Sequence, residues 1–431
     1  MTPAARTQSV IDILTDIFNN PKPADSITSF YFRNRRYIGS KDRSAISSTL
    51  FRIMRQYHRL GWWIEKAGMP IAPRTLALAE MLLNEETPVD PHEIFTGGRY
   101  TPDLLSKEEK ELAKALEGKK LNHQHMPVRA KTECPEWAFD RLQKALGADF
   151  EREMDAMKSS APMDLRVNLI KTDRDSALEI LKEDGVNAHA GKISPLSIRV
   201  HGRPPISQHP LFKDGAIEIQ DEGSQMVALV ANAKPGEQVV DFCAGAGGKT
   251  LAMGASMNNK GRIVAMDVLG GRLNRAKERF RRAGLHNIET RELTSERDKY
   301  VKRHVGHFDL VLVDAPCTGT GTWRRDPDKR WRQLGPGIDS LVPLQKSILD
   351  SACRMVKPGG RLVYATCSLL PEENEDQVEE FLKDHPEFTV QSVDQMPGFP
   401  KTGKYLKLTP ARHDTDGFFA ALLVRKNEKP A

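Results

Sequence analysis

Two cysteines stand where a catalytic thiol would be useful. Cys317 follows the apolar run 308–314 and the turn Ala315-Pro316. Cys367 directly follows the run 361–366. A thiolate that adds to carbon 6 of a cytosine makes an enamine of the ring, and carbon 5 can then attack an electrophilic methyl group. Methyl transfer to carbon 5 of a cytosine is thus a reaction that would explain why a thiol is needed at such a place.

The chemistry of a thiol does not decide which of these two cysteines is the nucleophile. Asp314, which ends the run before Cys317, is placed by the sequence to hydrogen-bond the amide edge of the target base. The remaining cysteines are expected to be small buried hydrophobic residues, the commonest state of a free cysteine; they are Cys134, Cys243 and Cys353.

A glycine-rich turn from Cys243 to Lys249 follows the first strand of the same region and reads Cys-Ala-Gly-Ala-Gly-Gly-Lys. Such a turn lets a ligand approach the backbone closely. A phosphate-binding P-loop would need glycine at position 243, and a dinucleotide fingerprint would need it at position 250, where the chain has threonine. The remaining interpretation is an S-adenosylmethionine site, since that ligand has no phosphate and needs no anion nest.

An acid at the end of the second strand supports this interpretation. Asp267 ends the run 262–267 and lies 22 residues after Gly245. A carboxylate at that place in a nucleotide-binding sheet can accept hydrogen bonds from both ribose hydroxyls. The alternative is that Asp267 only caps the following helix.

Strands and helices alternate from about residue 235 onward. Apolar runs predict strands at 238–243, 262–266, 308–314, 360–366 and 417–425. Helical periodicity predicts helices at 248–256, 270–283, 342–356 and 372–384. This alternation favours a largely parallel sheet covered on both faces, and ligands bind at the carboxyl ends of such strands.

The preceding sequence divides into two parts of different character. Residues 1–125 are mostly helical, and residues 130–232 combine helical stretches with short extended runs. We therefore expect three domains: a helical domain at 1–125, a small α+β domain at 130–232 and a catalytic α/β domain at 233–431.

Composition narrows the class of protein further. The 431 residues carry a net charge of +6 and no apolar run of membrane-spanning length. No secretory leader is recognisable, and five cysteines without a CxxC pair predict a reduced, cytoplasmic chain without a metal site. Arginines cluster between 272 and 282, which favours a solvated helix face, and around Trp323 and Trp331, which favours contact with RNA.

The combined motifs resemble the Fmu/Sun (RsmB-like) family of RNA cytosine-5 methyltransferases over about residues 130–428. The resemblance is carried by Asp314-Ala315-Pro316-Cys317, Thr366-Cys367-Ser368, the Gly-Gly-Lys-Thr loop, Leu165-Arg166-Val167-Asn168, Gln220-Asp221-Glu222-Gly223-Ser224 and His413 with Asp416-Gly417-Phe418-Phe419. The N-terminal segment resembles the helical NusB-like RNA-binding domain that precedes the bacterial ribosomal RNA members.

The resemblance implies a Rossmann-like class I methyltransferase domain with a mostly parallel seven-stranded sheet. It makes Cys367 the nucleophile and gives Cys317 a part in releasing the methylated product. The implied cofactor is S-adenosylmethionine, and the residues expected to bind it are Cys243, Ala244, Gly245, Ala246, Gly247, Gly248, Lys249, Asp267, Arg272, Glu292 and Asp314.

Two departures from the family pattern affect the cofactor site. The family loop usually reads Cys-Ala-Ala-Pro-Gly-Gly-Lys-Thr, whereas this chain has Gly245 and Ala246 in the middle. We expect that loop to be more flexible and to bind cofactor less tightly. The family also carries Asp after its third strand, where this chain offers Glu292 as an adenine-side contact.

The leading hypothesis is therefore a monomeric S-adenosylmethionine-dependent methyltransferase that modifies carbon 5 of cytosine in RNA, with 16S ribosomal RNA as the expected substrate. Two alternatives stay open. One is the same chemistry on transfer RNA. The other is a non-catalytic RNA-binding or ribosome assembly factor with a vestigial cofactor site.

Overall fold

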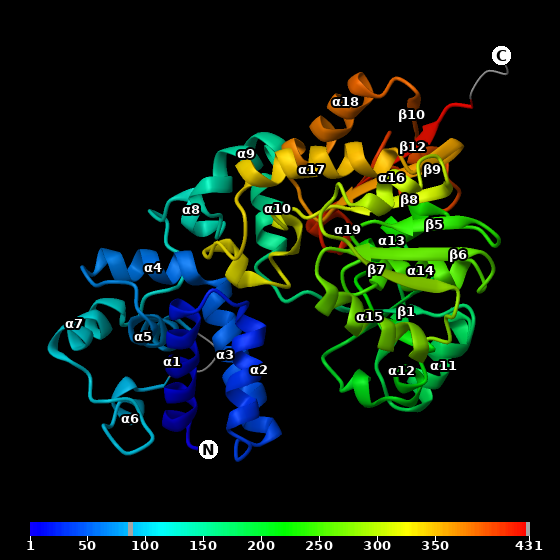
Figure 1. Ribbon diagram of the computed structural model, residues 1–431. Coiled ribbons are helices and arrows are strands. Elements are labelled where there is room, and N and C mark those ends of the chain that lie inside the picture. The colour runs from blue at the N-terminus through cyan, green and yellow to red at the C-terminus, as the bar shows by residue number, and fades with distance from the viewer. Residues whose placement is uncertain (85–88, 428–431) are drawn as a thin grey trace. The chain divides into compact units, whose positions relative to one another are not determined.

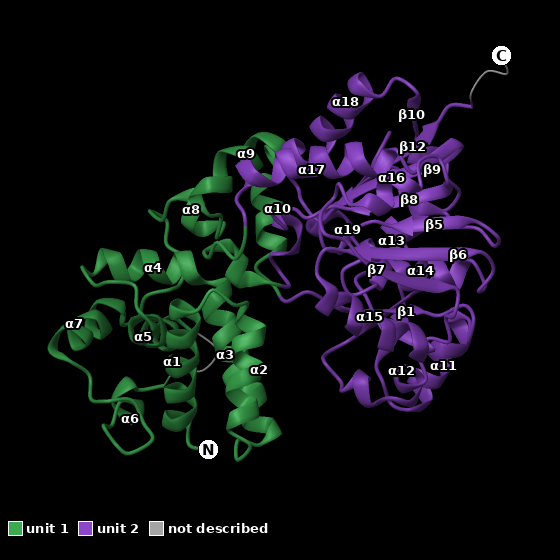
Figure 2. Ribbon diagram, viewed as in Figure 1, with its two compact units in different colours: residues 1–159, 326–335 green, residues 160–325, 336–431 purple. Residues whose placement is uncertain are grey.

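The computed structural model describes residues 1–84 and 89–427. Residues 85–88, inside the predicted helical domain, and residues 428–431, at the end of the predicted catalytic domain, lie outside the described residues. The chain forms two units (Figures 1 and 2). Unit 1 contains residues 1–159 and 326–335, and unit 2 contains residues 160–325 and 336–431.

Unit 1 is helical, as the periodicity of its sequence predicts. Its helices are α1 (Pro3–Asn19), α2 (Ala24–Asn34), α3 (Ser40–Arg55), α4 (Tyr57–Lys66), α5 (Pro73–Leu83), α6 (Pro91–Ile94), α7 (Lys107–Leu116), α8 (Val128–Lys131), α9 (Glu136–Leu146) and α10 (Phe150–Ala156). The apolar stripes of these helices meet in one core, in which Leu14 and Leu50 are completely buried. Side-chain caps begin some of these helices: the Thr2 hydroxyl accepts a hydrogen bond from Ala5 N, and Ser106 forms a capping box with Glu109.

The segment 326–335 returns from the catalytic part of the sequence to complete unit 1. The carboxylate of Asp328 accepts a hydrogen bond from Ala24 N at the beginning of α2, at 2.9 Å. The ring of Trp331 stacks on Tyr57 with centroids 4.3 Å apart. Trp323, in unit 2, is completely buried. The buried ring of Trp323 is therefore not available to unstacked bases, whereas Trp331 is only half-buried, and contact of this loop with RNA stays a prediction.

Unit 2 begins with a small antiparallel sheet. Its strand order is β2 (Ala188–Ala190), β3 (Ser197–Val200), β1 (Met163–Val167) and β4 (Ile217–Ile219). Helices α11 (Arg174–Glu183) and α12 (Pro210–Lys213) accompany it. We call this part the small sheet.

The large sheet of unit 2 has seven strands in line, with a further short strand at one side. The line is β10 (Phe388–Gln391), β12 (Phe418–Arg425), β9 (Val356–Thr366), β8 (Phe308–Asp314), β5 (Gln238–Asp241), β6 (Arg262–Asp267) and β7 (Ile288–Glu292). The strands from β9 to β7 are parallel, whereas β12 and β10 are antiparallel to their neighbours. Strand β11 (Leu406–Leu408) pairs with β12.

Helices cover both faces of this sheet (Figure 1). They are α13 (Glu222–Ala231), α14 (Gly248–Ser256), α15 (Gly270–Arg282), α16 (Lys299–Arg303), α17 (Ile338–Cys353), α18 (Glu375–Asp384) and α19 (Pro410–His413). Residues 310–313 of β8 are all buried, which explains why this strand reads as a continuous apolar run. The predicted Rossmann-like α/β fold with a largely parallel sheet is confirmed.

The division into three domains stays a prediction, and the structure itself groups the chain into two units. Residues 130–159 belong to unit 1, and the small sheet belongs to the same unit as the large one. Among the described residues, no helix is both long and apolar enough to cross a membrane.

Candidate active site

The two cysteines singled out by the sequence lie side by side. Their Sγ atoms are 3.4 Å apart, and both side chains are partly buried. The pairing of β8 with β9 explains this, since Asp314 is opposite Ala365 and each cysteine follows at the carboxyl end of its strand. The parallel sheet thus brings together residues that are 50 positions apart in the chain.

Backbone contacts join the loops that carry these cysteines. Gly321 N donates to the carbonyl oxygen of Cys367 at 3.0 Å, and Gly417 N donates to Gly321 O at 2.8 Å. The carboxylate of Glu373 accepts hydrogen bonds from Thr318 N at 2.8 Å and from Gln345 Nε2 at 3.0 Å. The loop after Cys317 is therefore held from both sides.

An ion pair between Lys249 and Asp314 lies at the same edge of the sheet. Lys249 Nζ is 2.6 Å from Asp314 Oδ2, and the lysine is largely buried. Burial alone would lower the pKa of Lys249, but the carboxylate of Asp314 outweighs it and raises that pKa above its usual value. Negative charge on Cys367 also raises the pKa of Lys249.

The two thiols have different surroundings. The hydrogen bond with Cys367 and then burial raise the pKa of Cys317 well above that of a free thiol. Cys317 therefore stays protonated at neutral pH, whereas Cys367 interacts electrostatically with the ammonium group of Lys249.

The glycine-rich loop joins β5 to α14 at the point where the chain order of the sheet reverses. Strand β5 has β6 on one side and β8 on the other, which is where ligands bind in open α/β sheets. Gly245 and Gly247 have φ angles of 56° and 79°, in the left-handed region that favours glycine. A side chain added at Gly245 would meet no atom within 4 Å, so the loop is open to a ligand there.

Asp267 lies beside that loop, as predicted. Its Oδ2 accepts a hydrogen bond from Gly245 N at 2.8 Å, and its Oδ1 accepts one from Leu269 N at 2.8 Å. Each oxygen keeps a further lone pair for a hydroxyl donor. Asp267 thus both caps the following turn and faces the loop, so the two interpretations of this residue are compatible.

Three other residues predicted to bind the cofactor lie in different surroundings. Glu292 is opposite Asp267 in the register of β6 and β7, and its carboxylate lies against Gly270 at the start of α15. Arg272 is exposed on the first turn of α15. Burial raises the pKa of Cys243 well above its usual range, so this residue offers its backbone rather than a thiolate.

Asp241, the last residue of β5, was not among the predicted site residues. Its Oδ2 accepts a hydrogen bond from Thr250 Oγ1 at 2.6 Å, whereas its buried Oδ1 has no hydrogen-bond partner. Burial raises the pKa of Asp241 to about 7. An acid at the end of the first strand of a nucleotide-binding sheet would have been a usable signal.

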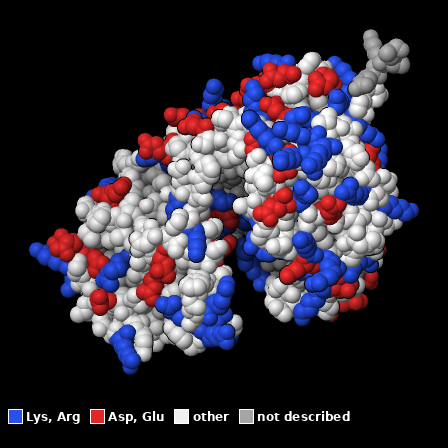
Figure 3. All heavy atoms as spheres, in the orientation of Figure 1, with Lys and Arg blue, Asp and Glu red and all other residues white. Residues whose placement is uncertain are grey.

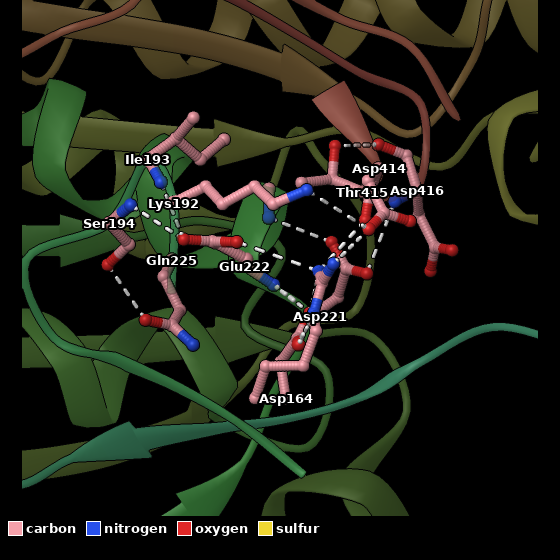
Figure 4. Close-up of polar contacts among 12 residues, drawn as sticks. Asp164, Lys192, Ile193, Ser194, Asp221, Glu222, Gln225, Asp414, Thr415 and Asp416 are labelled. Atoms are coloured by element: carbon pink, nitrogen blue, oxygen red, sulfur yellow. Dashed lines mark hydrogen bonds and ion pairs between the residues drawn. The ribbon is translucent and has the colours of Figure 1, made fainter. Parts of the chain in front are cut away.

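A buried network of charges lies behind the cysteine loops and was also missed. Asp416 accepts hydrogen bonds from Arg324 at 2.8 Å and from Arg325 at 2.7 Å. Arg199 of the small sheet donates to Asp164 and Asp414. Figure 4 shows the acids of β1, α13 and the segment before β12 converging in this network. It fastens the small sheet and the loop after Cys317 to the start of β12.

Comparisons with known proteins agree with this geometry. The family model for the 16S rRNA methyltransferase RsmB/F matches residues 228–424, and that for the RsmF/B-like ferredoxin-like domain matches residues 134–207. The ribosomal RNA small subunit methyltransferase B of Salmonella paratyphi C is 30% identical over 407 residues, covering 90% of this chain and 92% of the relative. The chain belongs to the RsmB/F methyltransferase family.

Further members and structures support the family and the fold. The probable ribosomal RNA small subunit methyltransferase B of Synechocystis sp. is 36% identical over 297 residues, which cover 67% of this chain and 66% of that protein, just under two thirds. The crystal structure of PH0851 has a TM-score of 0.82 at 27% identity and covers 98% of this chain and 99% of its own. A methyltransferase homologue from Pyrococcus horikoshii has a TM-score of 0.59 at 28% identity, over 69% of this chain and 97% of its own.

The cofactor of this RsmB/F family member is S-adenosylmethionine, and the described residues fit it. The open space at Gly245 admits a ligand to the loop backbone, and the Asp267 carboxylate has free lone pairs for ribose hydroxyls. When bound, the cofactor supplies the methyl group as an electrophilic sulfonium. Among residues 1–84 and 89–427, no cluster of three or more His, Cys, Asp or Glu side chains could hold a metal ion.

Proposed function

We propose that the protein methylates carbon 5 of a cytosine in 16S ribosomal RNA, with Cys367 as the covalent nucleophile. The observation that carries the proposal is the contact of two thiols, 3.4 Å apart, at the same sheet edge as the ion pair of the largely buried Lys249 with Asp314. One thiol would be enough to form a covalent adduct. A second one within reach of it favours a reaction in which the adduct has to be both formed and released.

The residues divide the work of the reaction. The Cys367 thiolate forms a bond to carbon 6 of cytosine, and the electron pair moves to carbon 5, which takes the methyl group. Lys249 and Asp314 are placed to hydrogen-bond the polar edge of the base and to compensate its charge. Loss of the proton from carbon 5 then lets the sulfur–carbon 6 bond break. The contact of Cys317 with Cys367 supports the role in release that the family resemblance implies.

Replacement of each cysteine tests the division of roles. Cys367→Ala should abolish methyl transfer, because no adduct forms. Cys317→Ala should still form the adduct and fail to release it, so that RNA and protein migrate together on a denaturing gel. Cys134→Ala, which changes a buried thiol in unit 1, is the control and should transfer at the normal rate. Normal transfer by Cys367→Ala would refute the proposal.

Ribosomal RNA as the substrate is supported by the relatives, which are named for the small ribosomal subunit. Positive charge on unit 2 also suits an RNA: Figure 3 shows Lys and Arg gathered over α16 and α17. A groove of about 500 Å³ there is lined by Arg297, Lys302, Lys346 and Arg354. The charge of Lys346 is partly neutralised, however, by Glu380 and Asp384.

Bisulfite sequencing of total RNA from a deletion strain distinguishes the substrates. Loss of one methylated cytosine from 16S ribosomal RNA is the expected result, whereas loss from transfer RNA would establish the alternative substrate. Action on ribosomal RNA also supports the predicted cytoplasmic location, since the enzyme has to meet that RNA. We also propose that the helical unit contributes to RNA binding and that the protein is a monomer.

A further inference from the structure

The cofactor loop, residues 243–249, contains three glycines and therefore needs support from outside itself. Glycine loses more conformational freedom on folding than any other residue. Asp267 holds one point of the loop through Gly245 N. Two arginines donate hydrogen bonds to two backbone carbonyl groups of the loop.

Arg279, on α15, is the first of these arginines. Its Nη1 donates a hydrogen bond to the carbonyl oxygen of Ala246. Its Nη2 is 3.4 Å from Glu218 of β4, which also pairs with Arg282 at 2.7 Å. The next residue of the helix, Phe280, lies so close to the loop that a side chain at Gly247 would come within 2.6 Å of its ring. The loop thus rests directly on α15.

Arg166, on β1 of the small sheet, is the second. It is 3% exposed, and its Nη1 donates to the carbonyl oxygen of Gly248 at 2.7 Å and to the side chain of Gln220. Burial lowers the pKa of Arg166 to about 10, so the guanidinium remains charged at neutral pH. The two arginines therefore hold the carbonyl groups on either side of Gly247.

We propose that Arg279 and Arg166 are positioning residues that hold the cofactor loop in its binding conformation and so set the affinity for S-adenosylmethionine. A charged donor at a carbonyl oxygen fixes the orientation of the peptide group, and a loop that is already ordered loses less entropy when the ligand binds. The expected flexibility at Gly245 and Ala246 is opposed in this way. The inference rests on the proposed function, which places the cofactor at this loop.

Titration calorimetry of Arg279→Ala with S-adenosylmethionine tests the proposal. We expect a dissociation constant about tenfold higher than that of the wild type, with an unchanged number of sites. In methyl-transfer assays the KM for S-adenosylmethionine should rise, whereas kcat and the KM for RNA stay the same. Arg281→Ala is the matched control, because it removes the same charge from an exposed position on the same helix. It should bind as the wild type does.

A conservative variant separates positioning from mere folding. Arg279→Lys keeps one charged donor and should recover part of the lost affinity. Arg279→Ala with an affinity within twofold of the wild type would overturn the inference, as would a lower number of sites with the affinity unchanged. Failure of the wild type to bind S-adenosylmethionine would instead contradict the proposed function, so the two failures are distinguishable.

Discussion

Individual residues at the carboxyl edge of the sheet owe their chemistry to neighbours that are distant in sequence. Lys249 follows β5, Asp314 ends β8 and Cys367 follows β9. Each of them alone would be an ordinary side chain at the end of a strand or, for Lys249, in the first turn of α14. Together they give the largely buried ammonium of Lys249 an ion pair with Asp314 and an electrostatic interaction with Cys367.

Asp241 gives a residue-scale prediction about pH. Burial raises its pKa from 3.8 to about 7, so the folded protein keeps the proton that the unfolded chain has already lost. Its contribution to stability is therefore present at low pH and falls as pH rises through that window. The side chain of Asp241→Asn cannot ionise in either state. Between pH 5 and pH 8 the free energy of unfolding should therefore fall less in this variant than in the wild type, by at least about 1 kcal/mol.

Thermal unfolding of both proteins at pH 5 and pH 8 checks this expectation. All other titrating groups are shared, so the difference between the two proteins isolates Asp241. Equal shifts of Tm in the wild type and in Asp241→Asn would show that the carboxyl group titrates normally.

At the scale of elements, the site depends on the close approach of two backbone segments. The loop after Cys317 touches the beginning of β12 at Gly321 and Gly417, which exchange a hydrogen bond at 2.8 Å. The same loop donates to Cys367 O. A side chain between the two glycines would therefore separate the loop from both the strand and the nucleophile.

Gly321→Ala should consequently destabilise the protein by about 2–3 kcal/mol, because its Cβ would lie 2.4 Å from Gly417 O and both partners are backbone. Gly271→Ala is the control: its Cβ would meet nothing within 4 Å, and alanine should stabilise α15 by at most about 1 kcal/mol. Chemical denaturation of both variants gives the free energies of unfolding. A Gly321→Ala variant as stable as the wild type would mean that the contact is not close in solution.

At the scale of the whole molecule, the chain passes between its two units more than once, whereas two consecutive domains would be joined by a single crossing. It passes from unit 1 to unit 2 after residue 159, and the segment 326–335 belongs again to unit 1. Trp331 of that segment stacks on Tyr57, and Arg332 donates to the carbonyl oxygen of Lys22 at 3.2 Å. Only nine positions separate Cys317 from Asp326, the first residue of the segment.

Trp331→Ala should therefore destabilise unit 1 by about 2–3 kcal/mol, because a stacked aromatic ring is lost from its packing. The affinity for S-adenosylmethionine should not change, since the residues expected to hold it are in unit 2. Tyr37→Ala is the control, as Tyr37 is 76% exposed. Calorimetry and cofactor titration measure the two effects; weaker cofactor binding by Trp331→Ala would show that unit 1 influences the cofactor site.

Most of the catalytic fold could be predicted from the sequence. The helix at 248–256 and the strand at 308–314 have the predicted bounds, because an apolar run between turn residues carries its own signal. Strand β10 was not anticipated, since it has only four residues at the edge of the sheet, and of these only Phe388 is buried. Helix α17 begins at Ile338 rather than at residue 342, because Pro343 lies inside it and obscures the helical pattern.

The sequence by itself determined the kinds of residue at the carboxyl ends of the strands. Parallel strands share that edge, and so Cys317, Cys367 and Asp267 had to lie along the same edge of the sheet once the alternation of strands and helices was recognised. Only the tertiary structure decided the pairing of Lys249 with Asp314 and the burial of Trp323. Such contacts depend on how side chains from distant segments pack together, and a local sequence pattern does not predict that packing.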